Sequence, residues 1–279
     1  MKLVFERWGH GSRPVLLLHG FTGNRHTWNR VRPALEPHVA ALAVDLPGHG
    51  ESSLPRGSGR DGFLETLEAL AELMQREGSG PVDVVGYSQG ARIALALAVH
   101  HPQQVRRLVL ESGSPGLHAR KLRSERRAED EVRARAIETS GVEAFLEGWE
   151  RLPLFDGLRR LPPAEQQALR ARRAGQTAEG LAGALRTLGT GVQPDYWPSL
   201  PHLRCPALLL TGREDAKYTA IARTMAAELP IVWRHAVADC GHAPHLEAPE
   251  VWCSEVLGFL STPWYEAQVE VEAATGSRS

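Results

Sequence analysis

The sequence has few of the features that characterise secreted, membrane-spanning or nucleic-acid-binding proteins. It contains three cysteines, an odd number without metal-ligand spacing, so we expect reduced thiols. Its formal net charge is -1, which provides no general electrostatic basis for binding nucleic acid or a membrane surface. The longest strongly apolar runs are too short to span a bilayer, and the N-terminus has no signal-peptide core. These absences predict a cytoplasmic protein.

The chain does contain short apolar runs that alternate with helical patterns. Hydrophobic residues make up 42% of its 279 residues, enough for one large core with room for an insertion. Buried strands are predicted at 14–18, 39–44, 82–85, 105–111, 207–210 and 231–237. Helices are predicted at 63–77, 91–99, 219–228 and 251–260. The alternation predicts an α/β fold, in which helices cover both faces of a mostly parallel sheet.

The strand patterns stop in the middle of the chain. Between 116 and 196, Arg, Ala, Glu and Leu dominate, and Pro153, Pro162, Pro163 and several glycines predict a series of short helices. We interpret this segment as a helical cap inserted into the core. The alternative is a set of ordinary solvated helices without contact to the site. The predicted division is a core of 1–115 and 197–262, a cap of 116–196 and a polar tail of 263–279.

A serine lies between a predicted strand and a predicted helix, flanked by two glycines. The pattern Gly86-x-Ser88-x-Gly90 in this context is typical of a nucleophile elbow. The turn is so tight that a side chain at either glycine would strike the strand or the helix. It would lift the Ser88 hydroxyl out of the sheet at the positive end of the following helix.

A serine hydroxyl is inert at its own pKa and needs a base, which a carboxylate holds in place. In this fold class the expected chain order is Ser, Asp, His. Ser88, Asp215 and His242 satisfy that order, and each follows a predicted strand. Asp239 is the alternative acid and His245 the alternative base, while ordinary polar loop residues are the structural alternative for both.

Negative charge that develops on a substrate oxygen needs N–H donors. The candidates are the backbone amides of Gln89, at the helix start, and Phe21, in the loop after His19. We expect His19 to brace this loop rather than to titrate in the reaction, and we expect His49, in a glycine-rich turn, to be structural too.

Arg92 is an unexpected cation in an apolar helix. It lies four residues after Ser88, so the two side chains share a helix face one turn apart. A buried cation is unfavourable unless it is paired. Arg92 either forms a structural salt bridge, for example with an acidic residue of the cap, or presents a forked donor to a substrate carboxylate beside the serine.

These motifs resemble the α/β-hydrolase superfamily over nearly the whole chain. The resemblance is carried by 18–23, 45–50, 86–90 and 241–242. Within that superfamily the chain is similar to the 2-succinyl-6-hydroxy-2,4-cyclohexadiene-1-carboxylate synthase family of menaquinone biosynthesis. The selecting features are 86–92, 114–117, 125–126, Asp130, Trp149, 152–155, 192–195, 212–218 and 242–247. Gln89 is a departure, because the family usually carries an apolar residue there.

The second resemblance implies a lyase that needs no metal or cofactor. Its substrate is a small anionic cyclohexene with three carboxylates, from which the triad would abstract a ring proton so that pyruvate is lost. Arg92 and Arg126 would bind carboxylates, and Tyr87 and Trp149 would line the pocket. The structural alternatives are a surface charge for Arg126 and a place in the cap core for Trp149.

Two other functions fit the same residues. A carboxylesterase or carbon–carbon bond hydrolase would use the triad to form an acyl-enzyme. A binding protein that has lost its chemistry is disfavoured, because all three triad positions are filled.

Overall fold

A seven-stranded sheet forms the centre of the molecule, in the order β1-β3-β2-β4-β5-β6-β7. The computed structural model describes residues 1–78 and 80–262. The strands are β1 (Phe5–Trp8), β2 (Arg13–Leu18), β3 (Val39–Val44), β4 (Val82–Tyr87), β5 (Val105–Glu111), β6 (Ala207–Gly212) and β7 (Val232–Val237). Neighbouring strands are parallel except for the edge strand β1, which is antiparallel to β3. The predicted α/β-hydrolase architecture is confirmed.

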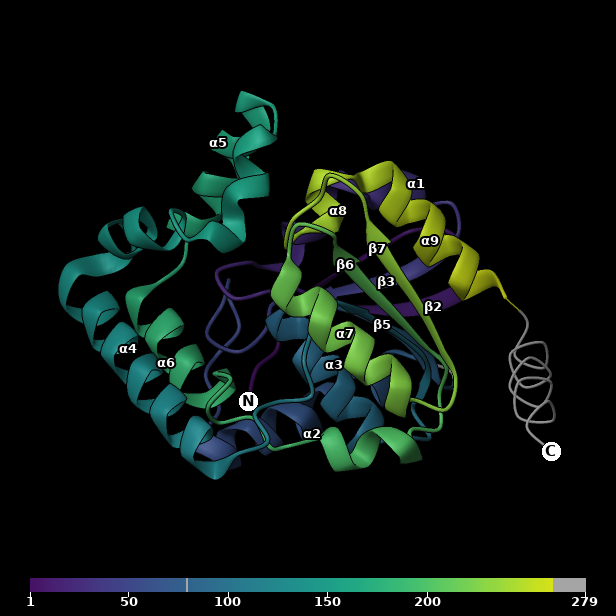
Figure 1. The fold of residues 1–279 in the computed structure, drawn as a ribbon, viewed down its shortest axis with the longest axis horizontal. Coiled ribbons are helices and arrows are strands. Elements are labelled where there is room, and N and C mark those ends of the chain that lie inside the picture. The colour runs from purple at the N-terminus through teal and green to yellow at the C-terminus, as the bar shows by residue number, and fades with distance from the viewer. Residues whose placement is uncertain (79, 263–279) are drawn as a thin grey trace.

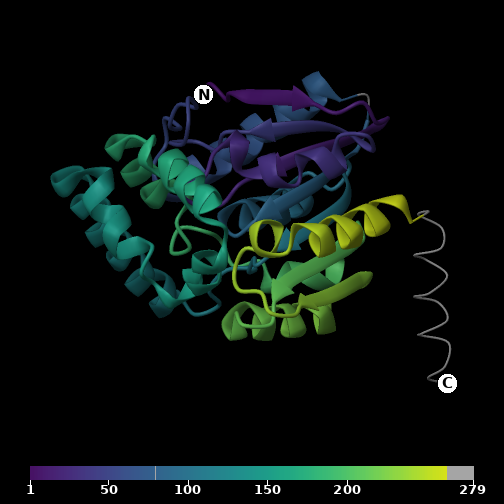
Figure 2. The ribbon, with the colours of Figure 1, turned by 90° about the horizontal axis from the view of Figure 1, so that it is seen from above.

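Helices cover both faces of this sheet (Figures 1 and 2). The α-helices are α1 (Arg32–Leu35), α2 (Gly59–Glu77), α3 (Gln89–His100), α4 (Arg120–Trp149), α5 (Pro163–Ala174), α6 (Ala178–Leu188), α7 (Ala216–Glu228), α8 (Pro244–Glu247) and α9 (Pro249–Ser261). The short 3-10 helices are η1 (Arg25–Arg30), η2 (Pro153–Arg160) and η3 (Trp197–His202).

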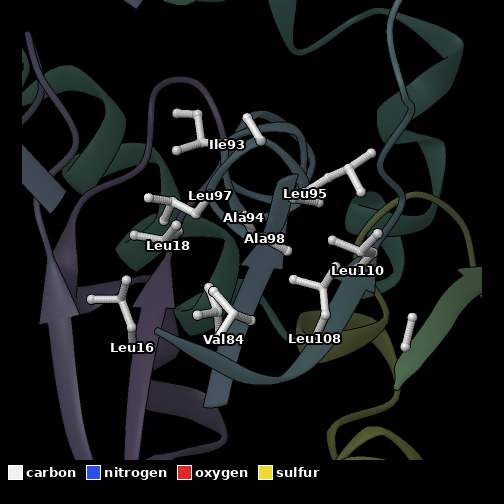
Figure 3. Packing of buried hydrophobic residues seen from close by; sticks show 14 of the residues in the cluster. Leu16, Leu18, Val84, Ile93, Ala94, Leu95, Leu97, Ala98, Leu108 and Leu110 are labelled. Atoms are coloured by element: carbon white, nitrogen blue, oxygen red, sulfur yellow. The ribbon is translucent and has the colours of Figure 1, made fainter. Parts of the chain in front are cut away.

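Alternate residues of each strand enter different cores, as the period of a strand requires. Leu16 and Leu18 of β2 pack with α2, α3 and α7, whereas Val15 and Leu17 pack with α1, α8 and α9. Figure 3 shows the first of these cores, where the apolar side chains of α3 meet those of β2, β4 and β5. Because α3 is covered so completely, its N-terminus is held firmly against the sheet, where Ser88 begins it.

The segment between β5 and β6 lies to one side of the sheet (Figures 1 and 2). Within it α4 and α6 form a small apolar core of their own, made by Ala134, Ile137, Leu181, Ala182 and Leu185. The element α4 spans 30 residues but consists of two helices that meet at a kink. The kink is at Gly141, whose backbone is non-helical with φ 82° and ψ 169°, so a glycine divides this part of the segment into shorter helices as predicted. The cap boundaries of 116–196 stay a prediction.

One edge strand and the start of one helix differ from the prediction for local reasons. The edge strand β1 was not predicted, because its four residues are too few for an alternating pattern to stand out. The helix predicted at 219–228 begins earlier, at Ala216, because the Asp215 side chain accepts a hydrogen bond from the Tyr218 amide and caps it. The predicted polar tail at 263–279 lies outside the described residues.

In the described part of the chain, no helix is both long and apolar enough to cross a membrane. The three cysteines, Cys205, Cys240 and Cys253, are unpaired and buried. Burial raises the pKa of each thiol, for Cys253 to about 11.

Candidate active site

Ser88 occupies a strained turn between β4 and α3. Its backbone has φ 51° and ψ -106°, a conformation that L-residues rarely adopt. A Cβ atom on Gly86 would collide with the carbonyl of Gly90, and one on Gly90 would collide with the carbonyl of Leu18. The Ser88 amide donates a 2.8 Å hydrogen bond to the Glu111 carbonyl of β5. Both glycines of the motif are therefore required by close backbone approach.

The structure brings together the three side chains of the predicted triad. The His242 Nε2 atom lies 3.0 Å from the Ser88 Oγ atom, and its Nδ1 atom lies 2.6 Å from Asp215 Oδ2. A carboxylate only accepts hydrogen bonds, so Nδ1 carries a proton and Nε2 is left to accept from the serine hydroxyl. The side chains of His242 and Asp215 are 2% and 5% exposed, which keeps water from competing for these bonds. This arrangement can remove the Ser88 proton.

The alternative acid and base lie elsewhere. Asp239 is exposed, and no hydrogen bond joins it to His242 among the described residues. His245 is fully buried and faces the Glu111 carboxylate at 2.7 Å, with Trp252 donating to the other oxygen of that carboxylate at 2.8 Å. The His245 ring is therefore hydrogen-bonded to Glu111 and not to Ser88.

Two backbone amides near Ser88 are available as oxyanion donors. Within the described residues, neither the Phe21 amide nor the Gln89 amide donates a hydrogen bond. Gln89 is the first residue of α3, so its amide has no partner inside the helix. The geometry is compatible with the predicted pair of donors.

Two buried histidines hold the loop that contains Phe21. His19 accepts a 2.9 Å hydrogen bond from the Leu46 amide, and His49 accepts one of 3.3 Å from the Thr22 amide. The other ring nitrogen of each histidine lies 2.7–3.1 Å from a backbone carbonyl. Burial lowers the pKa of His19 to about 4 and that of His49 to about 3, so both rings are neutral near pH 7. Both act as braces, as predicted.

A cavity of about 360 Å³ opens above Ser88, between the core and the segment at 116–196. Its cationic lining residues are Arg92, Arg126, Arg133, Arg173 and Lys217. Among the lining residues that the structure describes, Asp130 is the one carboxylate. The excess of positive charge favours an anionic ligand.

Arg92 is buried, 7% exposed, and forms hydrogen bonds only to neutral groups in the described chain. It donates to the Leu188 carbonyl at 2.9 Å and to Gln193 Oε1 at 3.2 Å. Burial lowers the pKa of Arg92 to about 10, so the group still carries its charge near pH 7. The alternative of a structural salt bridge finds no acidic partner for Arg92 among the described residues. The segment at 116–196 supplies neutral acceptors instead, and these orient the guanidinium without neutralising it.

Arg126 lies in the cavity wall and is paired. Its Nε atom donates to Asp130 Oδ1 at 2.8 Å, and Arg133 donates to the same oxygen at 3.0 Å. One carboxylate thus orients two guanidinium groups and leaves a net positive charge. Arg126 is therefore part of the cavity wall rather than an isolated surface charge.

Aromatic side chains form the apolar part of the cavity wall. Trp149 contacts the rings of Phe21, Phe145 and Phe155, and its buried Nε1 atom has no partner among the described residues. Tyr87 also lines the cavity, and its ring centroid lies 4.6 Å from that of the buried His245. Both predicted aromatic residues line the cavity.

Sequence reasoning missed several lining residues. Arg133 lies seven residues after Arg126 on α4, so helical periodicity could have placed both on one face. Lys217 and Tyr218 follow Asp215 directly and begin α7. No periodic signal predicts Arg173, which reaches the cavity from α5. Among the described residues, no group of three or more His, Cys, Asp or Glu side chains could hold a metal ion.

We expect Gly90→Ala to lower the free energy of unfolding by about 1–3 kcal/mol or more, because the added methyl group forces α3 away from β2. Gly258→Ala is the matched control. It lies inside α9 with open space around it, so alanine should stabilise the protein by up to about 1 kcal/mol. Urea denaturation of both variants checks this, and equal effects would contradict the close approach.

We expect stability to fall as the pH is lowered from 6.5 to about 5. The pKa values of His19 and His49 lie below 6.5 in the folded protein, so the unfolded chain takes up protons first. Each histidine should cost up to about 1.4 kcal/mol per pH unit toward the lower end of this range. Urea denaturation at a series of pH values measures the slope. His49→Gln should make it shallower, and an unchanged slope would contradict this account.

We expect Gln89→Met to stabilise the protein by about 1–3 kcal/mol, because both polar atoms of this side chain are buried without a partner in the described residues. The exposed Gln75 provides the control, since Gln75→Met should change stability by less than about 0.5 kcal/mol. Denaturant midpoints compare the two variants. A destabilised Gln89→Met protein would show that the amide has a partner.

Comparisons with known proteins agree with this geometry. The model of the alpha/beta hydrolase family matches residues 15–255. A Bacillus subtilis (strain 168) protein is 34% identical over 259 residues, 93% of this chain and 94% of its own. A Serratia proteamaculans protein named 2-succinyl-6-hydroxy-2,4-cyclohexadiene-1-carboxylate synthase is 32% identical over 91% of this chain and 96% of its own.

A solved structure is similar over almost the same length. The structure of MenH from S. aureus has a TM-score of 0.86 and 30% sequence identity, and the match covers 95% of this chain and 98% of that chain. The sequence match, the sheet order and the turn at Ser88 therefore agree, and the chain belongs to the alpha/beta hydrolase family.

Proposed function

We propose that this protein is a carbon–oxygen lyase of menaquinone biosynthesis. It eliminates pyruvate from 2-succinyl-5-enolpyruvyl-6-hydroxy-3-cyclohexene-1-carboxylate and gives 2-succinyl-6-hydroxy-2,4-cyclohexadiene-1-carboxylate. The proposal is supported by relatives that carry the name of this synthase and match over most of both chains. Its ligand is a small anion, and no metal or cofactor takes part.

The single observation that carries the proposal is the charge on Arg92. A buried guanidinium without a carboxylate partner in the described chain is costly, unless a ligand supplies the negative charge. It lies one helical turn from Ser88, beside the position where a reacting atom would bind. A simple ester hydrolase has no need of such a group.

The rest of the cavity wall suits a substrate with three carboxylates. We assign Arg92 and Arg126 to two of them, with the apolar ring of the substrate against Tyr87 and Trp149. Lys217 is exposed and lines the same cavity, so a cation remains available for the third. Several fixed cations would select this trianion over a neutral ester.

The triad serves as a base in this reaction. Ser88, whose hydroxyl proton passes to His242 while Asp215 orients the imidazole, removes a proton from C2, the ring carbon next to the succinyl carbonyl. The electron pair of that C–H bond moves toward the carbonyl, whose oxygen accepts hydrogen bonds from the Phe21 and Gln89 amides. When the charge returns, a double bond forms between C2 and C3 of the ring, the existing C3=C4 double bond moves to C4=C5, and the C5–O bond to the enolpyruvyl group breaks. The leaving oxygen keeps the bonding electrons, and the enolate of pyruvate that is released takes up one proton on carbon and becomes pyruvate.

Ester or carbon–carbon bond hydrolysis is the second candidate. The 3.0 Å distance between Ser88 Oγ and His242 Nε2 also suits nucleophilic attack and an acyl-enzyme. The charge of the cavity favours the lyase, because a neutral ester gains nothing from the buried Arg92. We further propose that the protein acts in the cytoplasm, where its unpaired cysteines would stay reduced.

We expect Arg92→Ala to lower kcat/KM for pyruvate release by about 10- to 150-fold, which corresponds to about 1.5–3 kcal/mol of transition-state binding for one charged hydrogen-bonding group. A coupled assay for pyruvate measures it. Arg223→Ala, which removes an exposed arginine of α7, is the control and should leave kcat/KM unchanged. Wild-type turnover in the Arg92 variant would refute the carboxylate-binding role.

The pyruvate assay and an ester-hydrolysis assay together separate the two candidate functions. The lyase releases pyruvate from the enolpyruvyl substrate. A protein that instead shows a rapid acyl-enzyme burst with p-nitrophenyl acetate, and forms no pyruvate, is the hydrolase.

A further inference from the structure

The side chain of Glu247 folds back onto the loop that carries His242. Its Oε2 atom accepts a 2.7 Å hydrogen bond from the Gly241 amide, and its Oε1 atom accepts a 3.0 Å bond from the Ala243 amide. These are the two residues on either side of His242. One carboxylate therefore fixes the backbone both before and after the imidazole.

The position of this carboxylate is set from several sides. The Glu247 side chain is 4% exposed, and Arg160 of η2 lies 3.6 Å from it. A Cβ atom on Gly157, also in η2, would collide with the Glu247 carboxylate, so η2 covers it closely. Because the carboxylate is enclosed and faces a cation, it has little freedom to leave the two amides.

The loop needs this acceptor. The amides of Gly241 and Ala243 are buried backbone donors, and no other acceptor for either is present among the described residues. Without the carboxylate, the backbone around His242 would turn toward other acceptors or toward water. A small rotation there moves the imidazole by a large fraction of a hydrogen-bond length, and the Ser88 contact depends on that length.

We propose that Glu247 is a positioning residue for the reaction, which holds the His242 imidazole in register with Ser88 through the two flanking amides. This inference rests on the proposed function, because it assumes that His242 takes the Ser88 proton. Glu247 itself touches neither Ser88 nor the cavity, so its removal acts on the rate of the chemical step rather than on substrate binding.

The test compares Glu247→Gln, Glu247→Asp and the wild type. Glutamine keeps the length but replaces one acceptor oxygen by a donor, and aspartate keeps the charge but is too short to reach both amides. We expect kcat for pyruvate release to fall at least tenfold in the first variant and at least fivefold in the second, with KM within twofold of wild type. Glu250→Gln, three residues on and exposed on α9, is the matched control and should leave both constants unchanged.

A second readout does not depend on the identity of the substrate. The rate at which diisopropyl fluorophosphate modifies Ser88 reports the activation of its hydroxyl, and it should fall in parallel with kcat. A wild-type protein that is modified but releases no pyruvate contradicts the proposed function, and the modification rates of the variants then decide the role of Glu247. If Glu247→Gln fails to fold, Glu247→Asp gives the answer. A folded variant with wild-type kcat and modification rate, or a loss confined to KM, overturns the proposal.

Discussion

The site depends on the close approach of α3 to the sheet at Ser88. There is no room for a side chain at Gly86 or Gly90, so the serine takes a strained backbone conformation and its hydroxyl is held above the carboxyl ends of the strands. The apolar packing of α3 against β2, β4 and β5 offsets the strain (Figure 3). Because that helix cannot shift, everything on its first two turns has a defined place relative to the serine. The Gln89 amide and the Arg92 guanidinium are both on those turns.

The core and the segment that covers it have different tasks. Parallel strands end at one edge of the sheet, and the loops after β4, β6 and β7 bring Ser88, Asp215 and His242 together there. The segment at 116–196 determines which charges in the cavity remain available to a ligand. It gives Arg92 two neutral acceptors, so the guanidinium is oriented while its charge remains available to a ligand. An acidic residue in the same place would have competed with a substrate carboxylate.

Much of this could be predicted from the sequence, because the signals are local. The glycines around Ser88 and the polar residues after apolar runs indicated the elbow, the sheet and the members of the triad. The partners of Arg92 could not be predicted, since Leu188 uses its backbone carbonyl and Gln193 is 101 residues away in the chain. The hydrogen bonds of Glu247 to the Gly241 and Ala243 amides could not be predicted either. A glutamate close to a histidine in the sequence looks the same whether its side chain faces water or accepts hydrogen bonds from the backbone.

The triad alone does not determine the reaction. The same three side chains can attack a carbonyl or remove a proton, and the family hosts many activities on one fold. What differs is which substrate atom is held against the Ser88 oxygen. In the proposed reaction, Arg92 and Arg126 would fix the trianion at several points, so the spacing of the cations would set the ring carbon that faces the serine. Under this proposal, the positions of the charged groups on α3 and α4 determine the reaction type, and the triad supplies the base for the substrate atom that is held there.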